Sequence, residues 1–339
     1  MKKNLIYLIV FVVLLAVAGW LLSERNTSGT LDKQGAERYA FTIKDTADID
    51  KIIIKDKTPS EVILKRSKSY WTVNGDKRVR NDAIEVLLET LYRMEMRNFI
   101  PERMQETVIK RMTVYGKEVE VFKNGKLFKT FYVGTEAQDE MATYMLIKGS
   151  DQPFAVHIPG FNGYLSSRFF TKEHLWRSRD VISIEPRSVR SIEMSYPDSV
   201  ASSFKFNVFS PDSIYITSLQ TGAVLTNRDK VKSNLFLNAF KNLKYEGLII
   251  PSDPIYSRRD SLLASVPIFR MKLTDVDGKI TTLSGYRIKS PAESMNPDLE
   301  RQDFDVDRMH GFINDEQMVL LQYYGLDAIL KSKDYFLKK

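Results

Sequence analysis

Short apolar runs that alternate with charged residues dominate the chain after residue 48. Residues 52–54 and 62–64 are β-branched or leucine runs, and residues 70–73 end at the turn dipeptide Asn74-Gly75. Such runs bounded by turn residues predict three short antiparallel strands. Residues 117–123 and 126–133 alternate in the same way around Asn124-Gly125, which is the dipeptide most typical of a two-residue hairpin. This part of the chain is therefore predicted to be rich in antiparallel sheet.

Two helices are expected between these strands. Asn81 is placed to cap a helix whose apolar residues recur at helical spacing. These residues are Ile84, Leu87, Leu88, Leu91 and Met94. Pro101 opens a second helix to about residue 111, and a strand pair of residues 144–147 with 154–158 closes the segment.

The same order of elements returns about 150 residues later. Strands are expected at 189–194, 204–209 and 214–217, followed by a helix that Asn227 caps. The apolar residues of this helix are Val231, Leu235, Phe236, Phe240 and Leu243. A helical stretch at 255–264, strands at 268–273 and 279–283 around Asp277-Gly278, and a pair of 304–307 with 318–321 complete the set. The recurrence predicts an internal duplication, with two related strand-rich α+β units at 48–180 and 181–339.

The N-terminal segment is apolar on every face. Residues 5–22 form an unbroken run of the length needed to span a bilayer as a helix, behind Lys2 and Lys3. The positive-inside rule then places residues 1–4 in the cytoplasm and the rest of the chain on the other side of the membrane. For a bacterial inner membrane, that side is the periplasm. Residues 23–47 are expected to begin the exported part as a polar linker. Cleavage as a signal peptide after Ala16-Val17-Ala18 is the alternative.

Composition excludes several classes of chemistry. The chain has no cysteine, which excludes disulfides, thiolate metal sites and a cysteine nucleophile, and it has only three histidines. The formal charge of +7 comes from 50 basic and 43 acidic residues that are interleaved along the chain, which favours a mixed solvated surface over a nucleic-acid site. We therefore expect no cofactor, no metal and no nucleic-acid partner.

The motifs that suggest chemistry are weak. The stretch from Asp275 to Gly278 resembles part of a calcium loop but lacks the outer ligands, and a type I′ hairpin turn is the better interpretation. The acids of the 303–307 segment are expected on the outer face of a half-buried strand, with a cation site as the alternative. Ser202 and Lys205 match a Ser-x-x-Lys spacing, but they enter a predicted strand and the partner motifs are missing.

The chain resembles a bacterial family catalogued only as a domain of unknown function, in the form seen in the Bacteroidetes group. The resemblance rests on the N-terminal anchor, the strands that end in Tyr70-Trp71-Thr72-Val73, the Asn81-Asp82 helix start, Tyr132-Val133-Gly134, the segment Ala155 to Phe161, and Trp176-Arg177. It implies a single-pass envelope protein whose relatives accompany ABC-type transporter components linked to gliding motility. It supplies no catalytic or binding residues.

The sequence therefore predicts a non-enzymatic, membrane-anchored accessory or scaffold protein of an envelope complex. The alternative is an extracytoplasmic enzyme or ligand-binding module that acts on envelope glycan or lipid. The candidate partner surface consists of Pro159, Gly160, Phe161 and Tyr164, because glycine and proline fix a turn on which two aromatic rings can act as interface anchors. The alternative is that both rings pack into the core of their unit.

Overall fold

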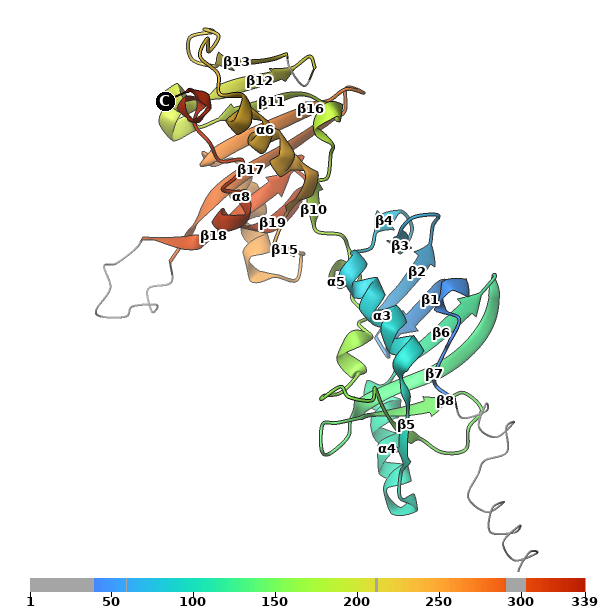
Figure 1. Cartoon of the computed structure of the whole chain (residues 1–339). Helices are drawn as coiled ribbons and strands as arrows, with labels where there is room; N and C mark the ends of the chain where they lie inside the picture. Colours follow the sequence, from blue (N-terminus) through green and yellow to red (C-terminus); the bar gives the residue numbers. More distant parts are fainter. Residues whose placement is uncertain (1–39, 59, 211–212, 291–302, 339) are drawn as a thin grey trace, which may run out of the picture. The chain divides into compact units, whose positions relative to one another are not determined.

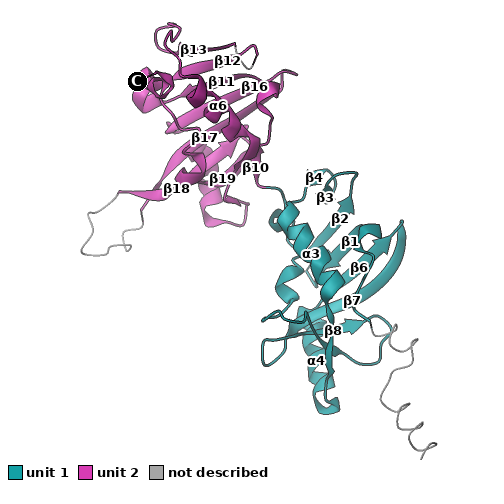
Figure 2. Cartoon of the chain, viewed as in Figure 1, with its two compact units in different colours: residues 1–178 teal, residues 179–339 magenta. Residues whose placement is uncertain are grey.

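The computed structural model describes residues 40–58, 60–210, 213–290 and 303–338. The chain divides into two compact units, residues 1–178 (unit 1) and residues 179–339 (unit 2), which Figure 2 shows in separate colours. The expected membrane span at 5–22 and most of the expected linker lie outside the described residues. Within the described ranges, no helix is long and apolar enough to cross a membrane.

Unit 1 is built on a nine-stranded sheet in the order β4-β3-β2-β1-β6-β7-β8-β9-β5 (Figure 1). Its strands are β1 (Ile49–Lys55), β2 (Glu61–Arg66), β3 (Trp71–Val73), β4 (Lys77–Arg78), β5 (Glu95–Phe99), β6 (Lys117–Lys123), β7 (Lys126–Glu136), β8 (Thr143–Ile147) and β9 (Phe154–His157). All neighbouring strands pair antiparallel. Its helices are η1 (Thr46–Asp48), α3 (Asn81–Arg93), α4 (Glu102–Tyr115), η2 (Ser166–Arg168) and α5 (Glu173–Trp176).

Two helices cover opposite faces of this sheet. Leu87 and Leu91 of α3 belong to one buried cluster with Val133 of β7, whereas Met112 of α4 belongs to another with Tyr144 of β8. Successive side chains of a strand point to opposite faces, which is why neighbouring strand residues enter different clusters. Gly134 lets α4 approach closely, since a Cβ there would lie 2.7 Å from the Cγ of Met112.

Unit 2 has an eight-stranded antiparallel sheet in the order β13-β12-β11-β16-β17-β18-β19-β15. Its strands are β11 (Val189–Ser195), β12 (Phe204–Val208), β13 (Ile214–Ser218), β15 (Gly247–Leu248), β16 (Phe269–Asp275), β17 (Ile280–Lys289), β18 (Phe304–Ile313) and β19 (Gln317–Gln322). A separate pair joins β10 (Asp180–Ile182) to β14 (Leu243–Lys244). The helices are η3 (Pro186–Ser188), η4 (Pro197–Ser202), α6 (Lys230–Ala239), η5 (Phe240–Asn242), η6 (Pro254–Arg258), α7 (Arg259–Leu263), α8 (Tyr323–Leu326) and η7 (Lys333–Phe336).

Aromatic packing holds α6 on the sheet of unit 2. The rings of Phe204 and Phe206 of β12 lie 5.7 and 5.3 Å from the ring of Phe236 of α6. Phe336 of η7 closes the cluster at 5.2 Å from Phe236. Edge-to-face contacts of this kind add to the stabilisation from apolar burial. The other face of the sheet is covered around Tyr286 and Phe312 by residues of η6 and α7.

The two sheets share one strand order and one register. The order β3-β2-β1-β6-β7-β8-β9-β5 corresponds strand by strand to β13-β12-β11-β16-β17-β18-β19-β15, and chain order is preserved. Ile52 pairs with Leu64 and Val121, and Ile192 pairs with Phe206 and Leu273 in the same way. The expected α+β class with strand-rich sheets is confirmed.

Both expected helix caps were wrong. α3 already includes Asn81, and its N-cap is Arg80, which makes no side-chain capping bond. The cap of α6 is Asp229 instead of Asn227, with its carboxylate accepting from the amides of Val231 and Lys232. Because α6 begins at Lys230, Val231 and Leu235 face solvent at 68% and 59% exposure, while Phe236, Leu237 and Phe240 are buried.

The two central hairpin turns differ. Asn124 and Gly125 both have positive φ, as a two-residue type I′ turn requires. The other turn spans residues 276–279, and only Gly278 has positive φ, so the expected type I′ turn at Asp277-Gly278 was wrong. There the Asp275 carboxylate accepts from the amides of Asp277 and Lys279, which stabilises a longer loop.

The acidic segment at the start of β18 is not half-buried. Phe304 and Val306 are exposed at 39% and 61%, and Asp305 accepts from the amides of Asp307 and Arg308. Pairing with β19 begins only at Arg308, whereas Phe304 pairs with Lys289 of β17. The sequence also missed β5, because four of its five residues are exposed and its pattern carries no alternation.

Candidate functional site

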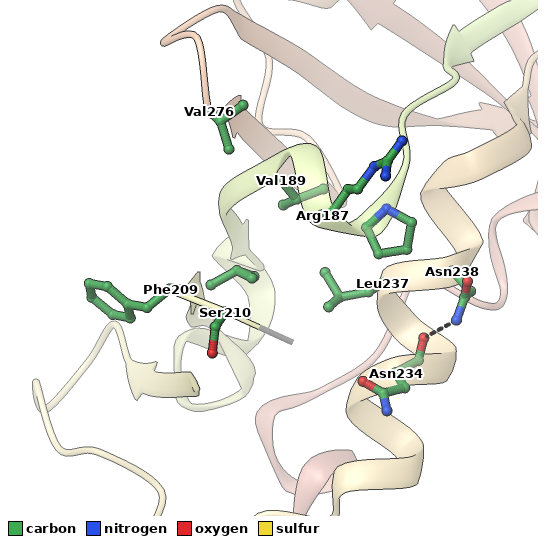
Figure 3. A pocket seen from close by; sticks show the side chains of 10 residues that line it. Arg187, Val189, Phe209, Ser210, Asn234, Leu237, Asn238 and Val276 are labelled. Atoms are coloured by element: carbon green, nitrogen blue, oxygen red, sulfur yellow. Dashed lines mark hydrogen bonds between the residues drawn. The ribbon is translucent and has the colours of Figure 1, made fainter. Parts of the chain in front are cut away.

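An apolar pocket of about 260 Å³ opens in unit 2 beside α6 (Figure 3). Its walls come from η3, the start of β11, the end of β12 with the loop after it, α6, and the β16–β17 turn. The lining includes Arg187, Val189, Val208, Phe209, Asn234 and Leu237. Leu237 projects from α6 into this space, opposite Val189. The volume suits one side chain or a very small molecule, since ligand pockets for larger molecules begin near 300 Å³.

The local sequence explains why this space is open. Pro186 starts the η3 turn, and the register of β11 with β16 shifts between Val189 and Ser191, which bends the strand at the pocket. The Asp229 cap sets the start of α6 and so aims Leu237 at the sheet. Val208, at the end of β12, is too short to fill the space between this strand and α6.

Unit 1 has a long side chain at the corresponding position. Arg66 and Val208 hold the same register position, two residues beyond the pairs Ile52–Leu64 and Ile192–Phe206. Arg66 Nε donates to Ile49 O at 2.6 Å, and its Nη2 donates to Thr46 O at 2.9 Å. By the same spacing, Ile49 and Thr46 correspond to Val189 and Pro186, which line the pocket of unit 2.

The charged residue that lines the pocket is Arg187. Arg187 is exposed, and among the described residues it makes no hydrogen bond or ion pair. None of the residues that line the pocket is acidic. Asn238 Nδ2 donates to the backbone oxygen of Asn234 at 2.8 Å, and Figure 3 shows the Asn234 side chain beside the pocket.

An exposed aromatic pair adjoins the pocket. Phe209 lines the pocket at 77% exposure, and its ring lies 5.7 Å from that of Tyr215, which is 52% exposed. Val276, also in the wall of the pocket, is 48% exposed. The apolar surface therefore continues from the cavity onto the outer face of unit 2.

A second pocket, of about 270 Å³, lies in unit 1 between β5, α4 and the loop after β7. Its charged groups already pair with each other, because Arg97 Nη1 lies 2.6 Å from Asp139 Oδ2. Bonds from the amide of Met141 and from Arg97 lower the pKa of Asp139, so this carboxylate stays ionised and is suited to holding the loop.

His157 and His310 belong to different units and have different surroundings. His157 Nε2 in β9 lies 3.8 Å from Glu95 Oε1, and His310 in β18 belongs to the other unit. Burial and the nearby Arg258 lower the pKa of His310, and its Nδ1 is buried without a hydrogen-bond partner. Among the described residues, no group of three or more His, Asp or Glu side chains could hold a metal ion.

The expected partner surface lies on the turn after β9. Gly160 and Gly163 have positive φ, and Pro159 O accepts a bond from Arg93 at 3.3 Å. Phe161 is partly buried against the core of unit 1, under the guanidinium of Arg168 at 4.3 Å from its ring centroid. Tyr164 is 38% exposed. The structure thus places the two rings differently, and a role in partner binding stays a prediction.

Ser202 and Lys205, the Ser-x-x-Lys pair, and the neighbouring Ser203 each contact a different residue. Ser203 is buried, and its hydroxyl accepts from the amide of Tyr196 at 2.9 Å just before β12. Ser202 bonds Ser199 at 2.8 Å. Lys205 lies on β12, with its Nζ 4.0 Å from Glu193 Oε2, and the hydrogen bonds of both serines go to other groups.

Sequence reasoning missed the pocket of unit 2. Its walls come from segments as far apart as residues 186 and 276, which no local pattern connects. Val208 stands opposite Arg66, and Arg187 opposite Ala47, only when the strands of the two units are aligned by their observed register, so the sequence carried no signal for this pocket.

The fold and the pocket define a strand-rich α+β protein made of two units of common strand order. The chain belongs to the family described as "Domain of unknown function (DUF4340)", whose model matches residues 71–260, more than half of the 339 residues. The match runs from β3 of unit 1 to α7 of unit 2. The expected membership of an uncharacterised family is thereby confirmed. Comparison with curated proteins and with solved structures gives no match.

Proposed function

We propose that this chain is a non-enzymatic, membrane-anchored accessory or scaffold protein of a bacterial envelope complex, and that unit 2 carries its partner-binding surface. The observation that carries the proposal is the aromatic pair of Phe209 and Tyr215 beside the apolar pocket. Exposed aromatic rings next to a pocket are the usual anchors of protein interfaces, because their burial releases much water at a low entropic cost.

The placement in the envelope rests on the sequence. The apolar run at 5–22 behind two lysines supports a single span with the two units outside the cytoplasm. The resemblance to Bacteroidetes proteins that accompany gliding-type ABC transporters supports such a transporter as the complex. The turn of Pro159, Gly160, Phe161 and Tyr164 is a second surface of this scaffold, with Tyr164 as its more exposed ring.

The proposal includes an internal duplication. Shared strand order, shared register and the matching positions of α3, between β3 and β5, and α6, between β13 and β15, support descent of both units from one ancestor. Duplicated units that keep one fold are free to divide their roles. The change from Arg66 to Val208 at one register position is the kind of divergence expected if unit 2 gained a binding role that unit 1 lacks.

Co-purification tests the proposal. The full-length chain with a C-terminal tag is expressed in its native host and extracted from membranes in mild detergent. Wild type should retain a stoichiometric membrane-protein partner, and Phe209→Ser with Tyr215→Ser should lose it. Val266→Ser is the matched control, because Val266 is 71% exposed in the same unit but does not line the pocket. A wild-type chain that purifies alone, or in the soluble fraction, would contradict the proposal.

A further inference from the structure

The two units carry different side chains at one register position, Arg66 in unit 1 and Val208 in unit 2. In unit 1, the guanidinium of Arg66 lies against the carbonyls of Thr46 and Ile49. In unit 2, the corresponding residues Pro186 and Val189 line an open pocket, since Val208 stands in place of the arginine. At this shared register position, unit 1 therefore has a long side chain that bonds the neighbouring backbone, whereas unit 2 has a short one beside a pocket.

The arginine of unit 2 stands on the rim of the pocket. Unit 1 carries Ala47 in the middle of η1, and unit 2 carries Arg187 in the middle of η3. Arg187 has no partner among the described residues, and the floor of the pocket below it is formed by Val189, Val208 and Leu237. An apolar floor under one unpaired cation is complementary to a ligand with an apolar group and a neighbouring carboxylate.

The surface around the pocket favours a polypeptide over a small molecule. Phe209 and Tyr215 are 77% and 52% exposed, and Tyr215 does not line the pocket, so a molecule confined to its volume of about 260 Å³ would not cover this aromatic pair. A polypeptide segment that places one side chain in the pocket would cover the aromatic pair with its flanking residues. Interface energy is typically concentrated in such a central anchor surrounded by residues that exclude water.

We infer that the pocket of unit 2 receives one apolar side chain of a partner polypeptide, and that Arg187 pairs with an Asp or Glu within two residues of that side chain. This inference rests on the proposed scaffold function and adds the chemistry of the partner segment. Binding requires an open pocket. An arginine at position 208, the counterpart of Arg66 in unit 1, should therefore close the pocket and prevent binding.

Photo-cross-linking in native membranes tests the inference. Benzoylphenylalanine replaces Asn234, which is exposed on α6 and lines the pocket, in the full-length chain. The same replacement at Leu235 is the control, because Leu235 is 59% exposed on the same helix but does not line the pocket. We expect a polypeptide adduct at position 234 at least about tenfold stronger than at 235. Its cross-linked peptide should contain a Leu, Ile, Val, Met or Phe with an acid within two residues.

Two further substitutions test the chemistry of the site. Val208→Arg should lower the adduct yield at least about tenfold in a unit 2 that still folds, because Arg66 holds the same register position in unit 1. Val200→Arg, at a 52% exposed residue of η4 that does not line the pocket, should leave the yield unchanged. Arg187→Glu should also lower the yield, whereas Arg190→Glu, an exposed arginine outside the pocket, should not. Exchanging the partner's acid for lysine should restore binding to Arg187→Glu.

A lipid adduct, no adduct at 234, or an adduct that Val208→Arg and Arg187→Glu both leave intact would overturn the inference. If those two variants keep the co-purifying partner while Phe209→Ser with Tyr215→Ser loses it, the scaffold function stands and the pocket is not its anchor. If no partner co-purifies with wild type, the scaffold function itself fails.

Discussion

Arg66 Nε donates to Ile49 O at 2.6 Å, and the guanidinium lies 4.7 Å from the ring centroid of Trp71. This one side chain joins the start of β1 to β2 and β3. The same register position in unit 2 holds Val208, so the two units differ in how they close this end of the sheet.

Replacing Arg66 with valine should destabilise unit 1 by about 1 kcal/mol, because two hydrogen bonds and one cation–π contact are lost at an exposed site. Tryptophan fluorescence during urea unfolding measures it selectively, since the three tryptophans of the chain, Trp20, Trp71 and Trp176, all precede residue 179 and unit 2 has none. Lys65→Val on the same strand is the control and should change the stability by less than about 0.5 kcal/mol. Equal losses for both variants would show that the bonds of Arg66 contribute nothing.

Asp229→Ala should destabilise unit 2 by about 1 kcal/mol, the usual effect of removing a side-chain N-cap. Its carboxylate accepts from two amides of α6, and no other side chain caps this helix. Asn227→Ala should have almost no effect, although the sequence pattern favoured Asn227. Far-UV circular dichroism of the full chain during urea unfolding distinguishes the two. A larger loss for Asn227→Ala would contradict the observed cap.

Phe161→Ala should cost about 1–2 kcal/mol, because the ring is partly buried under Arg168, while Tyr164→Ala should cost less than about 0.5 kcal/mol. If the turn is a partner surface, Tyr164→Ala alone should reduce co-purification without loss of stability. Tyr92→Ala, at a 47% exposed residue of α3, is the control. An unchanged complex with Tyr164→Ala would remove this turn from the partner surface.

Unit 2 should lose stability as the pH falls below 6.5. Burial and Arg258 lower the pKa of His310 from its ordinary 6.5, so the unfolded chain binds the proton first and is favoured at lower pH. The loss begins near pH 6.5 and ends below the pKa of the folded state. His310→Gln should flatten the dependence of the unfolding free energy on pH in this range, as followed by circular dichroism. An unchanged slope would show that His310 does not titrate on unfolding.

Patterns within about ten residues determined most of the elements. Alternation predicted the central strands, and Asn124-Gly125 predicted its hairpin, because positive φ at two successive residues is tolerated by few residue types. Helical periodicity placed α3, and the repeated order of these signals predicted two units of similar composition. In each of these cases, the residues that specify the element are the residues that form it.

Only the tertiary structure decided which of several suitable residues caps a helix, pairs as a strand or lines a pocket. Asp229 caps α6 instead of Asn227 because the main chain of residue 229 is fixed by a bond from its amide to Phe336 O. β5 exists because β9 offers it a pairing edge, although its own residues carry no strand pattern. The pocket of unit 2 depends on residues 186 to 276 meeting at one end of a sheet, and on Val208 being shorter than the arginine at the corresponding position of unit 1. Such a vacancy is a property of packing between distant segments, and it leaves no signal in the residues on either side of it.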